Sequence, residues 1–198
     1  MYSCAAIILA AGMSTRMGDT NKLLIEIDGT PMIRRTVMTA IAACDAPVTV
    51  VTGHQSDLVK AALSGLPVAF MFNPNFAKGQ KTSVACGLDA APEAENTLVV
   101  LGDQPRLTPQ NLSWLLAQHS AAKITIPICT GKRGNPIVVP HALKPMLLTD
   151  KRNPGCHTFT RQNPDLVNFV ETDQTAFFQD IDSPEDLENF NQQEELTP

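Results

Sequence analysis

Short apolar runs alternate along the chain with stretches of helical periodicity, and this alternation constrains the fold more than any other feature of the sequence. The runs include AAIILA at residues 5–10, PVTVVT at residues 47–52 and TLVVL at residues 97–101. Each run has the length and composition of one buried strand. Strands that alternate with helices form a mostly parallel sheet with helices on both faces. The sequence therefore predicts a three-layer, doubly wound α/β fold.

The same patterns place the other elements. Further strands are expected at residues 67–72, 123–128, 137–140 and 166–171, and a brief extended piece at residues 23–28. Helices are expected at residues 31–43, 55–63, 81–91, 109–121 and 141–148. A last helix is expected after Ser183, because this capping serine precedes Pro184 and two acids of the first turn.

Length and charge limit the class of protein. The chain has 198 residues, which fits one domain at roughly 100–200 residues per domain. We expect this domain at residues 1–191 and a polar tail at residues 192–198. The net charge of −5 argues against a nucleic-acid partner, which needs a basic surface, but not against a small anionic ligand. No apolar run approaches the ~20 residues that span a bilayer, and the start lacks the charge of a signal peptide, so we expect a cytoplasmic protein without membrane contact.

The cysteines are widely spread and form no C-x-x-C pair, at positions Cys4, Cys44, Cys86, Cys129 and Cys156. This spacing predicts neither a disulfide framework nor a zinc site. Four of them lie among apolar or small residues and are expected to be buried. Cys156 lies in a polar stretch and is expected to be exposed.

Three polar segments follow strands, at residues 11–22, 102–105 and 179–183. Parallel sheets bind ligands beyond the carboxyl ends of their strands, so a site is expected here. In the first segment, Gly12 and Gly18 can adopt φ > 0 and let backbone N–H groups approach an anion. Arg16 can fork onto phosphate oxygens, and Lys22 adds a compact charge. An ordinary surface turn with two solvated cations fits the same residues, and both interpretations stay open here.

The segment LAAGMSTRMG, followed by Lys22, resembles the pattern L-A-A-G-x-S-x-R-M-G-x-x-x-K of the MobA-like nucleotidyltransferase superfamily. The resemblance implies a Rossmann-like nucleotide-diphospho-sugar transferase fold and a magnesium-dependent transfer of a nucleotidyl group. It also implies contacts with the base and phosphates of a nucleoside triphosphate from Leu9, Ala10, Ala11, Gly12, Arg16 and Lys22.

Residues 73–88 are similar to the second motif of this family, which starts a helix beside the base and ribose. Gly79, Thr82 and Ser83 match that motif. The combination of LAAG and GQKTS resembles the molybdenum cofactor cytidylyltransferases, whereas the guanylyltransferases pair L-A-G-G with G-P-L-A-G. The resemblance thus implies CTP as the triphosphate, although Lys81 replaces a residue that is usually small.

Two acidic motifs resemble the metal-binding part of the family. Gly102-Asp103-Gln104-Pro105 is similar to G-D-Q-P and implies that Asp103 holds Mg²⁺ and is catalytic together with Arg16 and Lys22. The segment from Asp180 to Asp186 is similar to D-I-D-T-P-E-D. Asp180 and Asp182 point the same way in an extended segment, and one of them, preferably Asp182, is expected to complete the metal site. Magnesium is commonly held by one or two carboxylates together with phosphate oxygens.

Arg133-Gly134-Asn135-Pro136 matches the R-G-x-P of the family, which implies acceptor binding by Arg133, Gly134 and Asn135. A hairpin turn explains Asn135 equally well. Gly155-Cys156-His157 stands where the family usually has G-A-R. The resemblance implies transfer of CMP from CTP to the phosphate of molybdopterin, with release of pyrophosphate.

Two alternatives stay open at this point. The chain could use GTP or another triphosphate with a different phosphate acceptor, either a sugar 1-phosphate or a compound linked to purine catabolism. It could also bind the cofactor and deliver it to a molybdoenzyme partner.

Overall fold

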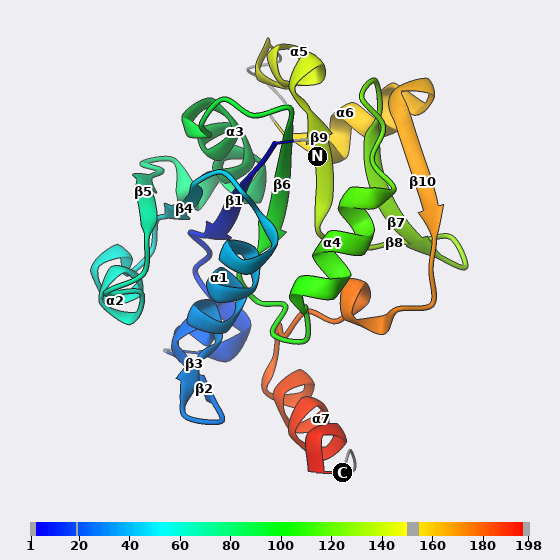
Figure 1. Ribbon diagram of the computed structural model, residues 1–198. Coiled ribbons are helices and arrows are strands. Elements are labelled where there is room, and N and C mark those ends of the chain that lie inside the picture. Colours follow the sequence, from blue (N-terminus) through cyan, green and yellow to red (C-terminus); the bar gives the residue numbers. More distant parts are fainter. Residues whose placement is uncertain (1–2, 19, 150–154, 196–198) are drawn as a thin grey trace.

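The computed structural model describes residues 3–18, 20–149 and 155–195, which form an eight-stranded sheet flanked by helices (Figure 1). The strand order is β10-β7-β9-β6-β1-β4-β5, and β8 pairs with β7 beside this path. The strands are β1 (Cys4–Ala10), β4 (Val48–Thr52), β5 (Val68–Phe72), β6 (Asn96–Leu101), β7 (Ile124–Cys129), β8 (Lys132–Arg133), β9 (Ile137–Pro140) and β10 (Val167–Glu171). A separate ribbon pairs β2 (Glu26–Ile27) with β3 (Thr30–Pro31).

The sheet is mostly parallel, as predicted. Strand β1 pairs in parallel with both β4 and β6, β5 continues the parallel order beyond β4, and β10 pairs in parallel with β7. Only β9, which runs antiparallel to β6 and β7, and the short β8 reverse direction among the described strands of this sheet. Leu9 lies opposite Leu101 in the ladder, so the segments that follow β1 and β6 leave the sheet side by side.

Helices cover both faces of the sheet, which confirms the three-layer prediction. They are α1 (Met32–Ala43), α2 (Ser56–Ala62), α3 (Gln80–Ala90), α4 (Pro109–Ala117), α5 (Lys144–Thr149), α6 (Cys156–Gln162) and α7 (Pro184–Glu195). Helices α1 and α4 pack into one core cluster and lie in front of the sheet in Figure 1. Helices α3, α5 and α6 contribute to a second cluster on the opposite face.

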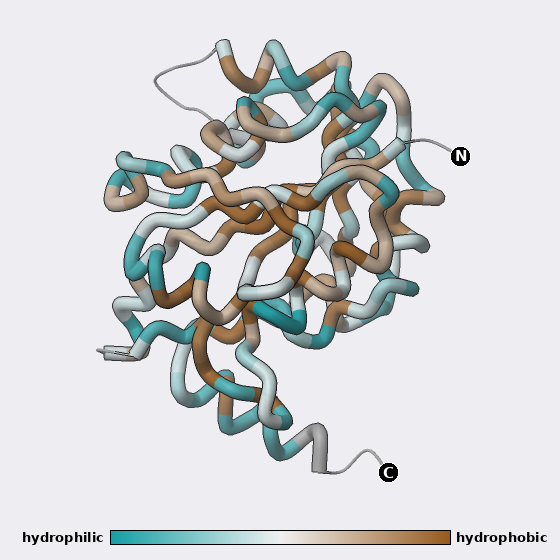
Figure 2. Tube along the Cα trace, turned by 60° about the vertical axis from the view of Figure 1, so that its left-hand side comes forward, coloured by the Kyte–Doolittle hydropathy of each residue, from teal (hydrophilic) through white to brown (hydrophobic). Residues whose placement is uncertain are grey.

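Strand β1 is the centre of both clusters because its side chains alternate between the faces. Ala6 and Ile8 belong to the first cluster, whereas Ile7 and Leu9 belong to the second. All seven residues of the strand are buried. Figure 2 shows the corresponding brown, apolar segments gathered in the interior, with polar residues on the outer turns.

Helix α3 approaches the sheet closely at Gly87. A Cβ atom there would lie 2.8 Å from both Ile7 Cδ1 and Val51 Cγ2. Overpacking a core costs ~1–3 kcal/mol, which exceeds the gain of roughly 1 kcal/mol in helix propensity from glycine to alanine. We therefore expect Gly87→Ala to lower the free energy of unfolding, measured by urea denaturation. An increase in stability would contradict this packing.

The elements differ from the prediction in two places before the C-terminal third of the chain. Helix α4 ends at Ala117 rather than Ala121, because the His119 ring and backbone N–H both bond Leu116 O and close the helix. The extended piece expected at residues 23–28 is divided. A 3₁₀ turn at Lys22–Leu24, capped by the Asn21 side chain, precedes the ribbon.

The C-terminal third holds the larger corrections. Helix α6 is absent from the sequence-based expectation, and its first residue, Cys156, is buried at 7% exposure rather than exposed. Gly155 begins this helix with φ of +104° and turns Cys156 into the second core cluster. Helix α7 continues through Glu195 and so includes the first residues of the predicted polar tail, and residues 196–198 lie outside the described part of the chain.

The cysteine prediction holds in its main point. All five cysteines are free thiols, although Cys44, Cys86 and Cys129 are half-buried rather than buried. Among the described residues, no helix combines the length and the apolar character that crossing a membrane requires.

Candidate functional site

A cleft of about 490 Å³ opens beyond the carboxyl ends of β1 and β6. Its lining comes from all three polar segments that follow strands, and from the start of α3. Two cations, Arg16 and Lys22, and three acids, Asp103, Asp180 and Asp182, line this first cleft. Residues far apart in sequence thus form one charged site.

Lys22 is the centre of the charged cluster. Its Nζ donates to Asp103 Oδ2 at 2.5 Å and to Asp182 Oδ1 at 2.7 Å, and Arg16 Nη2 lies 2.8 Å from Asp182 Oδ2. The Lys22 and Asp103 side chains are 12% and 16% exposed, whereas Arg16 is 66% exposed. Lys22 is therefore a fixed part of the site, and Arg16 is a cation at its rim.

The environment stabilises the charged forms of Lys22 and Asp182. Burial acts to lower the pKa of Lys22, but the charges and hydrogen bonds of Asp103 and Asp182 outweigh it, and the pKa lies above its ordinary value. Burial acts to raise the pKa of Asp182, but hydrogen bonds and charges from Lys22 and Arg16 hold that pKa below its ordinary value. Both groups therefore carry full charge near neutral pH.

Asp180 lies next to this cluster, but the ion pairs of Lys22 and Arg16 in the described chain are with Asp103 and Asp182. Burial, followed by the negative charges of Asp103 and Asp182, raises the pKa of its carboxyl group. The backbone places it there, because Ile181 N donates to Asp103 O at 3.0 Å and ties the segment before α7 to the end of β6. Three carboxylates thus crowd one end of the cleft.

The donor set fits a hard divalent cation. Asp103 Oδ1 is buried and has no hydrogen-bond partner within the described residues, so an oxygen of the right chemistry is unused. No three acidic, histidine or cysteine side chains of the described chain form a complete metal cage. The arrangement suits an ion that takes one or two carboxylates from the protein and its other oxygens from a ligand, as magnesium commonly does.

The predicted helix start fixes Asp182. Ser183 Oγ accepts from Asp186 N at 3.2 Å, and Asp186 Oδ2 accepts from the backbone N–H groups of Asp182 and Ser183. The hydrogen bond from the Ser183 hydroxyl is the main cause that lowers the pKa of Asp186. This cap, which the sequence predicted, holds the backbone from which the Asp182 carboxylate reaches Lys22.

The loop after β1 is shaped by Ser14 as well as by glycine. Ser14 adopts φ of +51° and Gly18 φ of +65°, with a 3₁₀ turn at Thr15–Met17 between them. Ser14 Oγ accepts from Lys22 N at 3.2 Å and joins the two ends of the loop. Gly18 uses the positive φ that glycine permits, whereas the backbone of Gly12 does not.

Gly12 leaves open space in the first cleft where a ligand can approach the backbone. A Cβ atom at this position would meet nothing within 4 Å, although Gly12 lines the first cleft. We expect Gly12→Ala to change the free energy of unfolding by less than about 0.5 kcal/mol, as for surface substitutions, and to raise the KM for triphosphate. Urea denaturation and transfer kinetics measure the two effects. An unchanged KM would show that the ligand does not approach this backbone.

The start of α3 forms the opposite wall. Gly79 and Ser83 line the first cleft as the motif implies, but Thr82 does not. The Thr82 hydroxyl donates to the carbonyls of Asn75 and Gly79 and accepts from Asn73 Nδ2. These bonds hold the turn before α3, and the ligand contact expected of Thr82 stays a prediction.

A second cleft of about 680 Å³ adjoins the first. It contains the three predicted acceptor residues Arg133, Gly134 and Asn135, and Asn135 lines both clefts. Gly134 is required by packing, since a Cβ there would lie 2.6 Å from Phe177 O. Asn135 N donates to the same carbonyl at 2.8 Å, so this segment is also a well-defined turn.

Most predicted nucleotide residues line the first cleft. Ala10 is the other exception besides Thr82, because it is 1% exposed and belongs to the first core cluster. The sequence analysis missed Phe76 and Gln80 in the first cleft and His157, Thr160 and Arg161 in the second. Only the departure from G-A-R near Gly155 hinted at the last group.

The fold and the site define an α/β protein with a charged cleft beyond the carboxyl ends of β1 and β6 and a second cleft next to it. The MobA-like NTP transferase domain matches residues 6–166, and the chain belongs to this family of nucleotidyltransferases. The family resemblance that the loop at residues 9–22 suggested is thereby confirmed.

Three proteins with similar sequences have names that refer to different functions. Nicotine blue oxidoreductase of Paenarthrobacter nicotinovorans is 26% identical over 189 residues, which are 91% of this chain and 93% of that protein. The bifunctional protein GlmU of Halorhodospira halophila is 40% identical over 57% of this chain, but the match spans only 24% of GlmU. A probable molybdenum cofactor guanylyltransferase of Natronomonas pharaonis is 31% identical over 61% of this chain and 59% of its own length.

Solved structures confirm the fold. A nucleotidyl transferase from Methanothermobacter thermautotroptrophicus has a TM-score of 0.86 at 22% identity and covers 99% of both chains. A Mycobacterium tuberculosis H37Rv protein, solved as a complex with manganese, has a TM-score of 0.71 at 18% identity and covers 94% of this chain and 97% of that one. The predicted nucleotide-sugar transferase fold is therefore correct.

Proposed function

We propose that the protein transfers CMP from CTP to the phosphate of molybdopterin and releases pyrophosphate. The observation that carries this proposal is the position of Lys22 between Asp103 and Asp182, at 2.5 and 2.7 Å, in a cleft that Arg16 also lines. Paired carboxylates beside cations suit a triphosphate together with a divalent ion. The loop residues Leu9, Ala11 and Gly12, whose pattern resembles that of cytidylyltransferases, line the same cleft. Their position supports CTP as the nucleotide of the proposal.

The proposed reaction needs no general base. A phosphate monoester has a second pKa of about 6 and is already an anion at neutral pH. One of its oxygens forms a bond to the α-phosphorus of CTP, while the bond from that phosphorus to the bridging oxygen breaks and pyrophosphate leaves with the electron pair. No histidine is among the described residues that line the first cleft, which is consistent with a reaction of this kind.

The barrier to such a transfer is to bring two polyanions together in line, so positioning and positive charge supply the catalysis. Arg16 and Lys22 are proposed to neutralise the β- and γ-phosphates and the departing pyrophosphate. Asp103 and Asp182, with Asp180 beside them, are proposed to hold Mg²⁺. The bound ion would stabilise the charge that develops on the phosphate oxygens.

A pyrophosphate-release assay with CTP, GTP, ATP and UTP, each with and without molybdopterin, tests the proposal. We expect release from CTP in the presence of molybdopterin and Mg²⁺, and little release without the acceptor. A preference for GTP would assign the chain to guanylyl transfer, and a rate independent of molybdopterin would overturn the acceptor assignment.

A second candidate keeps the reaction and changes the acceptor. It is favoured by Gly155-Cys156-His157, which departs from the usual G-A-R and lines the second cleft. The relatives named GlmU and nicotine blue oxidoreductase show that similar chains carry other names. Sugar 1-phosphates added to the same assay test this alternative.

A further inference from the structure

The second cleft combines an apolar floor with cations. Its floor is formed by side chains of α3, β6, β7 and β9, namely Val84, Val99, Ile126 and Ile137. Arg133 and Arg161 also line it, together with Lys81 at the start of α3. The described lining contains no aspartate or glutamate, although the whole chain has a net charge of −5.

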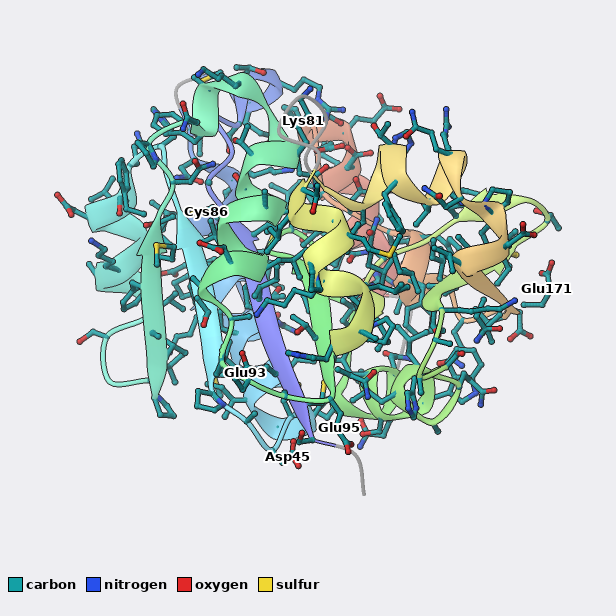
Figure 3. All side chains as sticks on the ribbon, turned by 90° about the horizontal axis from the view of Figure 1, so that it is seen from above. Asp45, Lys81, Cys86, Glu93, Glu95 and Glu171 are labelled. Carbon is teal, nitrogen blue, oxygen red and sulfur yellow. The ribbon has the colours of Figure 1, made fainter. Side chains whose placement is uncertain are left out.

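Three acids of the site, Asp103, Asp180 and Asp182, line the first cleft and not the second. In Figure 3, Lys81 lies at the start of α3 beside the start of α6, while Asp45, Glu93 and Glu95 gather at the opposite end of the sheet. Asp45 and Glu95 bond the backbone N–H groups of Cys4 and Ser3, at the beginning of β1. The charged side chains among the described residues that line the second cleft are therefore all cationic.

The Arg133 side chain is held in place by two contacts, and neither of them neutralises its charge. Its Nη1 donates to Thr160 Oγ1 at 3.0 Å, and its guanidinium lies 4.9 Å from the centre of the Phe169 ring. No carboxylate of the described chain pairs with Arg133 or Arg161. Burial, followed by the positive charge of Arg161, lowers the pKa of Arg133, so the two guanidinium groups lie close enough to repel each other.

The two clefts place these arginines away from the reacting phosphorus. Leu9, Gln80, Leu101 and Asn135 line both clefts and form their junction. An acceptor must bring its reacting oxygen to this junction to reach a triphosphate in the first cleft. Arg133 and Arg161 line the second cleft but not the first. They would therefore contact a part of the acceptor other than its reacting oxygen.

We infer that the acceptor carries a second anionic group, besides the one that reacts, on an apolar body that covers the floor of the second cleft. Arg133 and Arg161 bind this second group, with the fork geometry that guanidinium offers to oxyanions. The inference rests on the proposed function only in assigning the acceptor to this cleft. The anion site itself follows from the residues that line it.

Two fluorescent probes with the same apolar body test the site without any transfer reaction. The anion 8-anilinonaphthalene-1-sulfonate carries a sulfonate, and N-phenyl-1-naphthylamine lacks it. We expect Arg161→Gln and Arg133→Gln each to weaken binding of the anionic probe by about tenfold, as the loss of one charge-assisted hydrogen bond predicts. Binding of the neutral probe should not change.

Matched variants locate the effect. Lys132→Gln removes the neighbouring cation on β8, which lines neither cleft, and Arg16→Gln removes a cation of the first cleft. Both should leave the affinity of the anionic probe unchanged. Equal affinity in wild type and both arginine variants, no binding to wild type, or parallel loss of the neutral probe would each overturn the inference. Because no nucleotide is used, the result is independent of the pyrophosphate-release assay.

Discussion

Asp103→Ala should reduce kcat for pyrophosphate release by roughly 10³, the upper range seen when one preorganised charge-stabilising group is lost from an active site. The variant loses the oxygen that bonds Lys22 at 2.5 Å and the buried Oδ1 that has no partner among the described residues. The fold should persist, because Lys22 keeps Asp182 as its second partner. Transfer kinetics at saturating Mg²⁺ and thermal unfolding measure the two effects separately.

Asp103→Asn is the sharper variant, since its shape is nearly unchanged. The amide has no charge, and one orientation directs its N–H₂ group at the Lys22 ammonium. We expect the same loss of kcat and a weaker affinity for Mg²⁺, measured by calorimetry. Asp165→Asn, at an exposed aspartate that lines neither cleft, is the matched control. Full turnover of Asp103→Asn would remove Asp103 from the catalytic site.

The sequence could predict the parts of the site that follow strands directly. The apolar runs locate β1 and β6, and in a parallel sheet the residues after such runs must meet at one edge. Lys22 and Asp103 could therefore be expected in one cleft, although they are 81 positions apart. The Ser183 cap could be predicted equally well, because its pattern lies within four consecutive residues.

The sequence could not predict which hydroxyl or backbone group serves the fold rather than the ligand. Thr82 matches a ligand motif, yet its hydroxyl is used by the carbonyls of Asn75 and Gly79. Gly12 has open space around it and does not use the positive φ that glycine permits, while Ser14 takes a left-handed conformation that favours glycine. These outcomes depend on tertiary contacts that no local pattern encodes.

Helix α6 shows a different limit. It has seven residues, fewer than the 11–18 that establish helical periodicity, and it starts at a glycine after a polar stretch. Missing this helix led to the wrong expectation for Cys156 and left Arg161 out of the predicted acceptor residues. Those residues were Arg133, Gly134 and Asn135, and the only hint of α6 was the departure from G-A-R near Gly155.

Lys22→Ala should have an effect comparable to that of Asp103→Ala, with a different signature. Loss of a buried cation from the triphosphate site should reduce kcat/KM for triphosphate by roughly 10²–10³. Asp103 and Asp182 would then face each other without the lysine that now bonds both, at 2.5 and 2.7 Å. Without divalent metal, the variant should lose about 1–3 kcal/mol of stability, less than the 3–5 kcal/mol of a fully buried broken pair.

Magnesium should distinguish this variant from wild type. In wild type the ammonium competes with a metal ion for the same carboxylates, whereas in Lys22→Ala the ion meets no competitor. A ligand that binds only the folded state stabilises it by RT ln(1 + [L]/Kd), so tighter binding gives a larger rise in Tm. We expect MgCl₂ to raise the Tm of Lys22→Ala more than that of wild type, or of the exposed control Lys60→Ala. An equal rise in all three proteins would mean that Asp103 and Asp182 do not hold the metal, whatever the loss of activity.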